Sequence, residues 1–310
     1  MLFSPRQFLL VLLTVIFLLG LGAPWAAAQG EARTITDVLG REVTLESPPQ
    51  RVVGMSASIT EILYAIGVTP VGATEGIDYP PEAASLPTFG TGYQPDLEAL
   101  AALEPDLIIA SAQLQQDIVD QLEAIAPTIY VLILTVADVP PTVRMIGQAA
   151  WHDTTAEYLA ESEESFLNYL EMTKPSEGPS VLIIVGLLQL PNYGKSTSYL
   201  GHMASLLGAT NIADGEEDSG PFPGYAQLSV ESILEADPDI ILTITKGPPG
   251  VAPMPEVMAV DPVWSSLSAM QNGRVYEVDS RLFLESPGPR FGEAIQELYG
   301  ILYGQGEAGE

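Results

Sequence analysis

The sequence contains one internal repeat, in which two segments of the same design lie 133 residues apart. In each copy a stretch with the spacing of a short helix is followed by Pro-Asp and then by an aliphatic run, over residues 95–109 and 228–242. Proline ends the helix, and the short aliphatic run has the length of a strand buried in a sheet. The alignment pairs Glu98 with Glu231. We therefore expect two halves of similar architecture.

A second, looser correspondence predicts the fold class of both halves. Segments that end in Gly at helical spacing, residues 60–67 and 203–208, each follow a strand-like run, residues 51–54 and 181–185. Strands that alternate with helices indicate mostly parallel sheets with helices packed on them. We predict an α/β protein with two Rossmann-like lobes.

Residues 154–173 contain neither Gly nor Pro and lie between the two halves. Their apolar residues recur at helical spacing, and the glutamates occupy mostly the other faces. We predict one stiff helix of about 30 Å that joins the lobes. An ordinary surface helix within a single domain is the alternative. The predicted organisation is an N-terminal lobe over residues 29–153, a connecting helix over 154–174 and a C-terminal lobe over 175–310.

Residues 1–28 have the order of a secretory signal peptide. Arg6 precedes an apolar run over residues 8–19, and small residues follow at 26–28. An uncleaved membrane anchor is the alternative, but the apolar run is short for a span of about 20 residues. We expect cleavage near Ala28 and export. Because the sequence has no Cys, we expect no lipid-modified anchor, which favours the periplasm.

Composition argues against several classes of function. The chain has 40 acidic residues against 11 Lys and Arg, so charge repulsion opposes binding to nucleic acid or to an anionic membrane. Without Cys and with only His152 and His202, thiolate nucleophiles and multi-His metal sites are not expected. Residues 194–197 resemble the end of a phosphate-binding loop but lack its first Gly, and no G-x-S-x-G motif occurs. We predict no catalytic residues, no cofactor and no metal site. An exported α/β hydrolase with a carboxylate pair and a metal-ion binder are the alternatives.

Turn-rich loops follow the predicted strands, and each carries an aromatic residue, a Pro or both. In open α/β sheets the loops at the carboxyl ends of the strands surround the ligand. Aromatic side chains there suit a large, partly apolar ligand between two lobes. For each residue alone, packing within its own loop is the alternative. The candidates are Tyr79, Tyr93, Tyr193, Phe222, Tyr225 and Phe283.

A set of segments, none decisive alone, gives the chain a family resemblance. The segments are residues 34–43, 51–63, 78–80, 97–108, 208–212, 228–231, 264–276 and 287–290. In this order they resemble the solute-binding proteins of ABC importers for ferric siderophores, haem and cobalamin. The resemblance implies the class III periplasmic binding protein fold, in which one long helix bridges two α/β lobes. It also implies a non-catalytic receptor whose partner is a permease dimer in the inner membrane.

The resemblance implies roles for individual residues. In the family one Glu on each lobe docks onto Arg pockets of the membrane subunits, and the matching positions are Glu98 and Glu231. Two exposed carboxylates can pair bidentately with guanidinium groups and orient the receptor. A carboxylate that stabilises a helix start is the alternative for each. Other matching positions are cleft candidates: Tyr225 and, in a later loop, Arg281, Phe283 and Glu285.

The identity of the ligand is the least constrained prediction. Ferric tris-catecholates are strongly anionic and need cationic side chains, yet only three Lys and seven Arg follow the predicted cleavage site. We expect a siderophore-type iron chelate of low charge, such as a hydroxamate, with cobalamin or another corrinoid as the alternative. Haem ranks third, because the spacing from Tyr93 to Glu98 departs from the haem-binder pattern. We expect a monomer in which ligand binding rocks the lobes by a few degrees.

Overall fold

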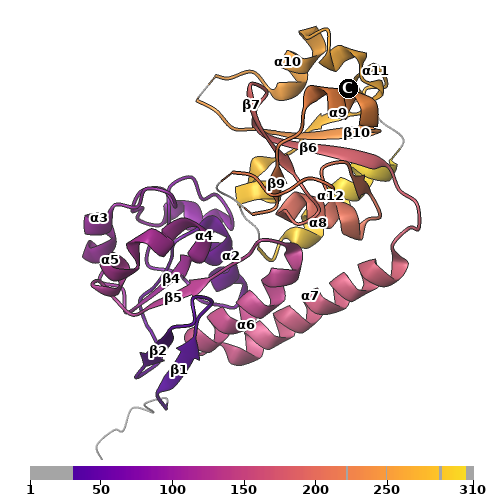
Figure 1. Cartoon of the computed structure of the whole chain (residues 1–310). Coiled ribbons are helices and arrows are strands. Elements are labelled where there is room, and N and C mark those ends of the chain that lie inside the picture. The colour runs from indigo at the N-terminus through magenta and orange to yellow at the C-terminus, as the bar shows by residue number, and fades with distance from the viewer. Residues whose placement is uncertain (1–30, 221–222, 249, 286–287, 305–310) are drawn as a thin grey trace, which may run out of the picture.

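The computed structural model describes residues 31–220, 223–248, 250–285 and 288–304. Two α/β lobes lie at opposite ends of one long helix, α7 (Asp153–Thr173), which runs beneath both of them (Figure 1). The fold is therefore the predicted class, two Rossmann-like lobes joined by a long helix. None of the helices within the described ranges combines the length and the apolar character that a membrane span requires.

The N-terminal lobe is built on a parallel sheet with the strand order β3-β4-β5. Alternate strand residues face opposite sides, so Ile109 packs with α2 and α6 whereas Ile108 packs with α3, α4 and α5. Helices thus cover both faces. The elements are β3 (Val52–Gly54), α2 (Ala57–Ala65), α3 (Leu97–Ala102), β4 (Leu107–Ser111), α4 (Ala112–Gln115), α5 (Val119–Glu123), β5 (Thr128–Val131) and α6 (Val139–Ala149). Short 3₁₀ helices cover Pro81–Ser85, Gln116–Ile118 and Val136–Asp138.

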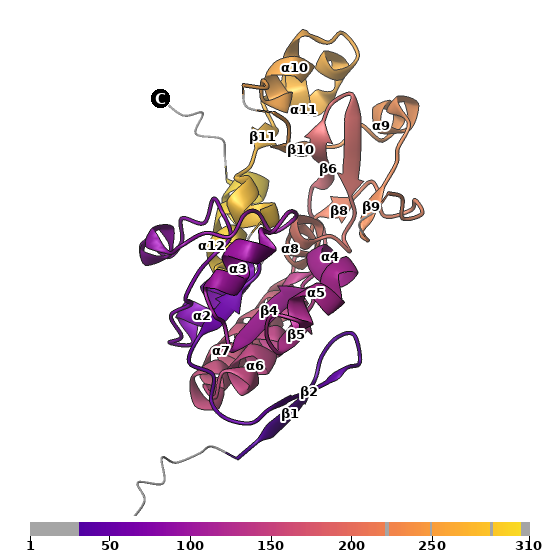
Figure 2. The same ribbon diagram turned by 90° about the vertical axis from the view of Figure 1, so that its left-hand side faces the viewer.

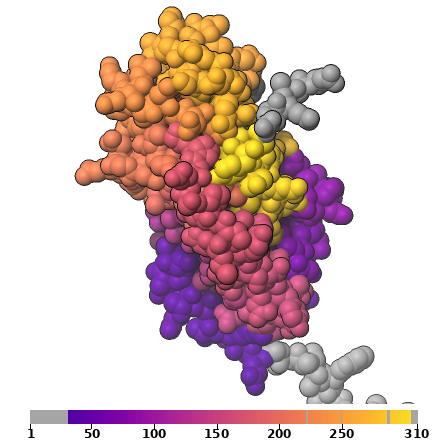
Figure 3. Space-filling model, turned by 90° about the vertical axis from the view of Figure 1, so that its right-hand side faces the viewer, coloured from indigo at the N-terminus to yellow at the C-terminus, as the bar shows by residue number. Residues whose placement is uncertain are grey.

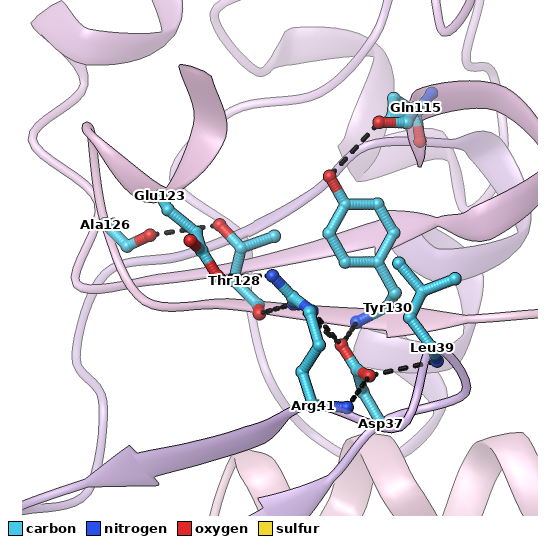
Figure 4. Close-up of polar contacts among 8 residues, drawn as sticks. All are labelled: Asp37, Leu39, Arg41, Gln115, Glu123, Ala126, Thr128 and Tyr130. Atoms are coloured by element: carbon cyan, nitrogen blue, oxygen red, sulfur yellow. Dashed lines mark hydrogen bonds and ion pairs between the residues drawn. The ribbon is translucent and has the colours of Figure 1, made fainter. Parts of the chain in front are cut away.

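A separate antiparallel hairpin, β1 (Arg33–Thr36) and β2 (Glu42–Leu45), lies at the outer end of this lobe (Figure 2). Its turn is fixed by Asp37, whose buried carboxylate accepts hydrogen bonds from the backbone N–H groups of Leu39, Arg41 and Tyr130 (Figure 4). The Arg41 guanidinium also pairs with this carboxylate at 2.7 Å. Asp37 therefore joins the hairpin to strand β5.

The C-terminal lobe has a mixed sheet with the strand order β11-β10-β6-β7-β9, and β8 pairs with β6. The pairs among β11, β10, β6 and β8 are parallel, and the pairs of β7 with β6 and β9 are antiparallel. The strands are β6 (Ser180–Leu187), β7 (Leu190–Gly194), β8 (Thr210–Asn211), β9 (Tyr225–Ala226), β10 (Ile240–Thr245) and β11 (Val275–Glu277). The helices are α8 (Tyr199–Leu206), α9 (Val230–Ala236), α10 (Met254–Val260), α11 (Ser268–Gln271) and α12 (Phe291–Tyr303), with a 3₁₀ turn at Trp264–Ser266 and a π-helix at Arg281–Glu285.

The repeated Pro-Asp has the same structural role in both lobes. The Asp106 carboxylate accepts the backbone N–H groups of Gln50 and Arg51 at 2.7 and 2.8 Å, just before β3 begins. The Asp239 carboxylate accepts the backbone N–H of Ser180 at 2.8 Å, where β6 begins. In each lobe this strand neighbours the strand that follows the Pro-Asp. The aspartate therefore anchors the start of one central strand to the next.

α7 connects the lobes through a shared hydrophobic core. The core cluster of the α2 and α6 side continues through Ala160 and Leu170 of α7 to α8 and α12 of the C-terminal lobe. α6 approaches α7 closely because position 147 is Gly; an added Cβ there would lie 2.1 Å from the Cβ of Ala156. The His152 Nδ1, at the start of α7, hydrogen-bonds to the Ile66 carbonyl at 2.8 Å. The helix is thus held along its length by packing against both lobes.

Candidate functional site

A cavity of about 640 Å³ lies between the two lobes. Its walls are formed where β3, β4 and β5 end in one lobe and where β6 and β10 end in the other. In doubly wound sheets this edge is where ligands bind, and the volume is typical of a small-molecule site. From the N-terminal lobe the lining residues are Ser56, Ala57, Ser58, Ile59, Thr74, Glu75, Gly76, Ile77, Thr91, Gly92, Tyr93, Ser111, Gln113, Leu114, Val131 and Ile133. From the C-terminal lobe they are Val185, Gly186, Asn192, Tyr225, Lys246, Leu284 and Glu285.

Two of the predicted aromatic residues line this cavity from opposite lobes. Tyr93 comes from the loop before α3 and is 71% exposed, whereas Tyr225 starts β9 and is half-buried. Burial, with a smaller contribution from Tyr93, raises the pKa of Tyr225 to about 12. Tyr225 therefore stays a neutral phenol at physiological pH, and the two rings offer apolar faces with hydroxyl donors to a bound molecule.

The cavity lining carries few charges, one ammonium and two carboxylates. Lys246 follows strand β10, and its ammonium forms an ion pair with the Glu285 carboxylate at the end of the π-helix. Glu75 lines the wall that the N-terminal lobe contributes. Partial burial lowers the pKa of Lys246 from its ordinary value. The other polar lining groups are the neutral hydroxyls and amides of Ser, Thr, Gln and Asn.

Gln115 organises the wall that carries Tyr93, a role that the sequence did not reveal. Its side chain is buried, and its amide donates to the Gly92 carbonyl at 2.5 Å while its carbonyl accepts the Ser111 N–H at 2.8 Å. The Tyr130 hydroxyl in turn donates to the Gln115 backbone carbonyl. This network ties the loop beside Tyr93 to the end of β4. An uncharged Gln in a polar run gave no signal of that role.

Two of the predicted cleft residues belong to the hydrophobic core instead. Tyr193 is 2% exposed and packs against the outer face of its sheet, whereas its neighbour Asn192 faces the cavity, because successive strand residues point in opposite directions. Phe283 is fully buried in the core, and the next two residues of the π-helix, Leu284 and Glu285, line the cavity.

Two further candidates lie outside the cavity lining, between the lobes. The ring of Tyr79 lies 4.1 Å from the guanidinium carbon of Arg290. The guanidinium of Arg281 forms an ion pair with Asp78 of the N-terminal lobe. The Tyr79 ring and the Arg281 guanidinium therefore each contact a residue of the opposite lobe. Phe222 lies outside the described residues.

Glu98 and Glu231 occupy equivalent places in the two lobes. Each is exposed in the first turn of its helix, α3 or α9. Asp96 caps α3 by accepting the backbone N–H groups of Glu98 and Ala99, and Ser229 caps α9 by accepting the N–H of Ser232. Among the residues that the structure describes, neither glutamate takes part in an ion pair within the chain. Both carboxylates are therefore exposed to a partner.

In the part of the chain that the structure describes, no three His, Asp or Glu side chains gather closely enough to hold a metal ion. A second hollow, of about 560 Å³, lies among α7, α8 and α12. Figure 3 shows α7 and α12 side by side on that face. Its lining is mainly apolar and includes Tyr169, Leu170 and Tyr299. It does not adjoin the carboxyl ends of the strands, so the interlobe cavity is the candidate site.

Comparison with known proteins identifies the family. The family model described as periplasmic binding protein matches residues 52–282. An uncharacterized ABC transporter substrate-binding lipoprotein of Bacillus subtilis, YvrC, is 28% identical over 94% of this chain and 95% of its own length. The Fe(3+)-citrate-binding protein YfmC of the same organism is 29% identical over 80% of this chain and 79% of its own. The fold matches that of the petrobactin-binding protein YclQ from Bacillus subtilis, with a TM-score of 0.75 at 20% identity over 88% of this chain and 99% of that one. The chain belongs to the periplasmic binding protein family.

Proposed function

We propose that this protein is the substrate-binding component of an ABC importer and that it captures a siderophore-type iron chelate between its lobes. The observation that supports this most is the cavity at the carboxyl ends of the strands of both lobes, with Tyr93 and Tyr225 on its two sides. A chelate with an apolar periphery and carbonyl or hydroxyl groups suits such a lining of aromatic rings and neutral polar groups. The protein is a receptor rather than an enzyme, as its family indicates.

Delivery to the permease is proposed to use the exposed pair Glu98 and Glu231. Each carboxylate is positioned by a capped helix start, one on each lobe, and is free to pair with guanidinium groups of a membrane partner. We further propose that the receptor acts as a monomer and that its lobes divide at the connecting helix over residues 154–174, which corresponds to α7.

The proposed location is the periplasm, after removal of a signal peptide near Ala28. The support is the order of charge, apolar run and small residues in residues 1–28, which lie outside the described part of the structure. The relative YvrC is a lipoprotein by name, whereas this sequence contains no Cys to carry a lipid. Cell fractionation with mass spectrometry of the mature N-terminus tests this proposal.

Cobalamin is the alternative ligand, because a corrinoid is large, partly apolar and suited to the same tyrosine pair.

Haem ranks below both the iron chelate and cobalamin as a ligand. An iron-ligating tyrosine must lose its proton, and the pKa of Tyr225 is raised to about 12 by burial. Deprotonation of that phenol is therefore unfavourable in the unliganded protein.

The test is a fluorescence titration of the purified protein with ferric hydroxamates, ferric catecholates, haem and cobalamin. We expect saturable quenching with a ferric hydroxamate and a weakening of about tenfold or more in Tyr225→Ala, which removes a ring from the cavity. Tyr158→Ala is the matched control, because this Tyr is 70% exposed on α7 and does not line the cavity. Failure of every ligand class to bind contradicts the proposed function.

A further inference from the structure

Lys246 is the single Lys or Arg that lines the interlobe cavity among the residues that the structure describes. The other Lys and Arg side chains of the described residues contact groups elsewhere. Their partners are Asp153 for Arg33, Asp37 and Glu123 for Arg41, the Leu103 carbonyl for Arg51, Glu157 and Glu164 for Arg144, the Leu302 carbonyl for Arg274, Asp78 for Arg281, Glu61 for Arg290, Ser205 for Lys174 and Asp218 for Lys195. The internal positions outside the description are 221, 222, 249, 286 and 287, which carry no charged residue. The cavity therefore has little positive charge to offer an anion.

Glu285 cancels the charge of Lys246. The two side chains form an ion pair and are 42% and 43% exposed, so both face the cavity and remain accessible to a ligand. Glu75 adds a second carboxylate to the lining. The lining thus holds two carboxylates and one ammonium, a formal charge that opposes an anionic ligand.

One feature of the cavity, the N-terminal end of helix α2, favours an anion, and the charge that it contributes can be compared with that of the carboxylates. The first turn of α2, including Ser58 and Ile59, lines the wall and brings the positive end of a helix dipole, equivalent to roughly half a charge. The Ser56 hydroxyl already accepts the Ile59 N–H. Even together with the Lys246 ammonium, half a charge does not offset the two carboxylates, so the lining offers no net positive charge to a chelate with several negative charges.

We propose that the cleft selects iron chelates of zero or positive net charge and rejects anionic ones, and that Glu285 sets this selectivity by neutralising Lys246. This inference rests on the proposed function and specifies its substrate class. It separates the chain from its relative YfmC, whose name assigns it ferric citrate, an anionic complex. The rest of the specificity comes from the neutral polar groups and tyrosines that surround the pair.

The experiment compares three ferric complexes of different charge by titration of the full mature protein at about 0.15 M salt, where the Debye length is about 8 Å and distant surface charges are screened. The probes are ferrioxamine B, which is cationic, ferrichrome, which is neutral, and ferric citrate, which is anionic. We expect ferric citrate to bind wild-type protein at least about tenfold more weakly than whichever hydroxamate binds better.

Glu285→Gln is the decisive variant, because it removes the neutralising carboxylate and leaves Lys246 in place. We expect it to raise the affinity for ferric citrate by about tenfold relative to ferrichrome, and to lower that for ferrioxamine B. The double variant Glu285→Gln/Lys246→Gln should lose the gain. Glu256→Gln on α10 is the control, since Glu256 is exposed and outside the cavity lining and its removal changes the net charge equally.

The outcomes separate this inference from the proposed function. If ferric citrate binds wild-type protein as tightly as the hydroxamates, or if Glu285→Gln and Glu256→Gln behave alike, the charge selectivity is wrong while the receptor function stands. If none of the three chelates, a ferric catecholate, cobalamin or haem binds, the proposed function fails and the inference fails with it.

Discussion

Arg290 and Glu61 form a bidentate ion pair that joins the two lobes. The Arg290 Nε and Nη2 atoms donate to the two Glu61 carboxylate oxygens at 2.8 and 2.7 Å. The Glu61 side chain is 2% exposed and that of Arg290 is 16% exposed. Arg290 precedes α12 and follows in sequence the π-helix, whose last residue, Glu285, lines the cavity. The pair therefore fixes one wall of the cleft to helix α2 of the opposite lobe.

The first prediction concerns this pair. Arg290→Ala should lower the free energy of unfolding by about 3–5 kcal/mol, because it leaves the buried Glu61 carboxylate without its partner. Urea denaturation measures the change. Arg144→Ala is the matched control. Arg144 forms ion pairs with Glu157 and Glu164 at the surface, and loss of exposed pairs costs only about 1 kcal/mol or less. Equal losses in the two variants would show that the interlobe pair has no special role.

The second prediction is a pH dependence centred on Glu163 of α7. This side chain is buried, and within the described residues neither carboxylate oxygen has a hydrogen-bond partner. Burial is the main cause that raises the pKa of Glu163 to about 7; nearby Glu164 raises it further and Arg144 opposes the shift. The folded protein therefore binds more protons than the unfolded chain between pH 4.5 and 7. The contribution of Glu163 is favourable at low pH and is lost as the pH rises through 7.

Glu163→Gln should remove this dependence. At pH 8 the variant should be more stable than wild type by up to about 3 kcal/mol, because the amide has no charge to desolvate. At pH 4 the two proteins should differ little. Denaturation series at pH 4, 6 and 8 test this expectation. Glu161→Gln, at an exposed position of the same helix, should have the same small effect at each pH. A parallel stability profile for wild type and Glu163→Gln would contradict the assigned pKa.

The fold could be predicted from local sequence patterns, whereas the directions of individual side chains could not. The repeated Pro-Asp and the stretch without Gly or Pro over residues 154–173 are continuous segments of the chain, so the strands and α7 could be predicted from them. Tyr193 shows the limit, because a shift of one residue along a strand reverses the face that a side chain occupies. Its neighbour Asn192 lines the cavity instead. No local pattern of residues determines that register.

The cleft shows a second limit, which is distance along the chain. The Lys246–Glu285 pair and the Glu61–Arg290 pair join residues 39 and 229 positions apart. Only the folded arrangement reveals which charges cancel. The sequence contains few cations, but it does not reveal that the one beside the cavity is neutralised. Tyr93, Tyr225 and Glu285 line the cavity, and their roles in ligand binding stay predictions.

The third prediction separates core residues from cavity residues. Phe283→Ala should lower the free energy of unfolding by about 3–5 kcal/mol, since it leaves a hole in the core that contains this fully buried ring. Tyr225→Ala should instead weaken ligand binding at a smaller cost in stability. Thermal denaturation and titration on the same preparations distinguish these effects. A stable Phe283→Ala protein that has lost ligand affinity would show that Phe283 contributes to ligand binding and not to the stability of the core.

The fourth prediction concerns motion between the lobes. α7 packs on both lobes through one continuous core, and the Glu61–Arg290 pair adds a second link. A wide hinge needs a few loop residues that absorb large backbone changes. We therefore expect the ligand to change the interlobe angle by only a few degrees. Distance measurements between spin labels on α3 and α9, with and without ligand, test this. A rotation above about 20° would contradict the stiff connection.

The fifth prediction concerns delivery by the permease. Glu98→Arg with Glu231→Arg replaces two exposed carboxylates by cations, so both contacts with guanidinium groups of a partner become repulsive. Uptake of the iron chelate by cells that carry the variant should fall by at least about tenfold, whereas the affinity of the purified variant for ligand should not change.

Glu161→Arg provides the control for this experiment, because it makes the same change of charge at an exposed position on α7, away from both helix starts. It should leave uptake intact. Each single variant should give a partial loss, since the opposite lobe keeps its contact. Normal uptake in the double variant would show that these carboxylates only stabilise their own helices, as acidic residues in a first turn do. Loss of ligand affinity together with uptake would instead place the defect in the fold of the lobes.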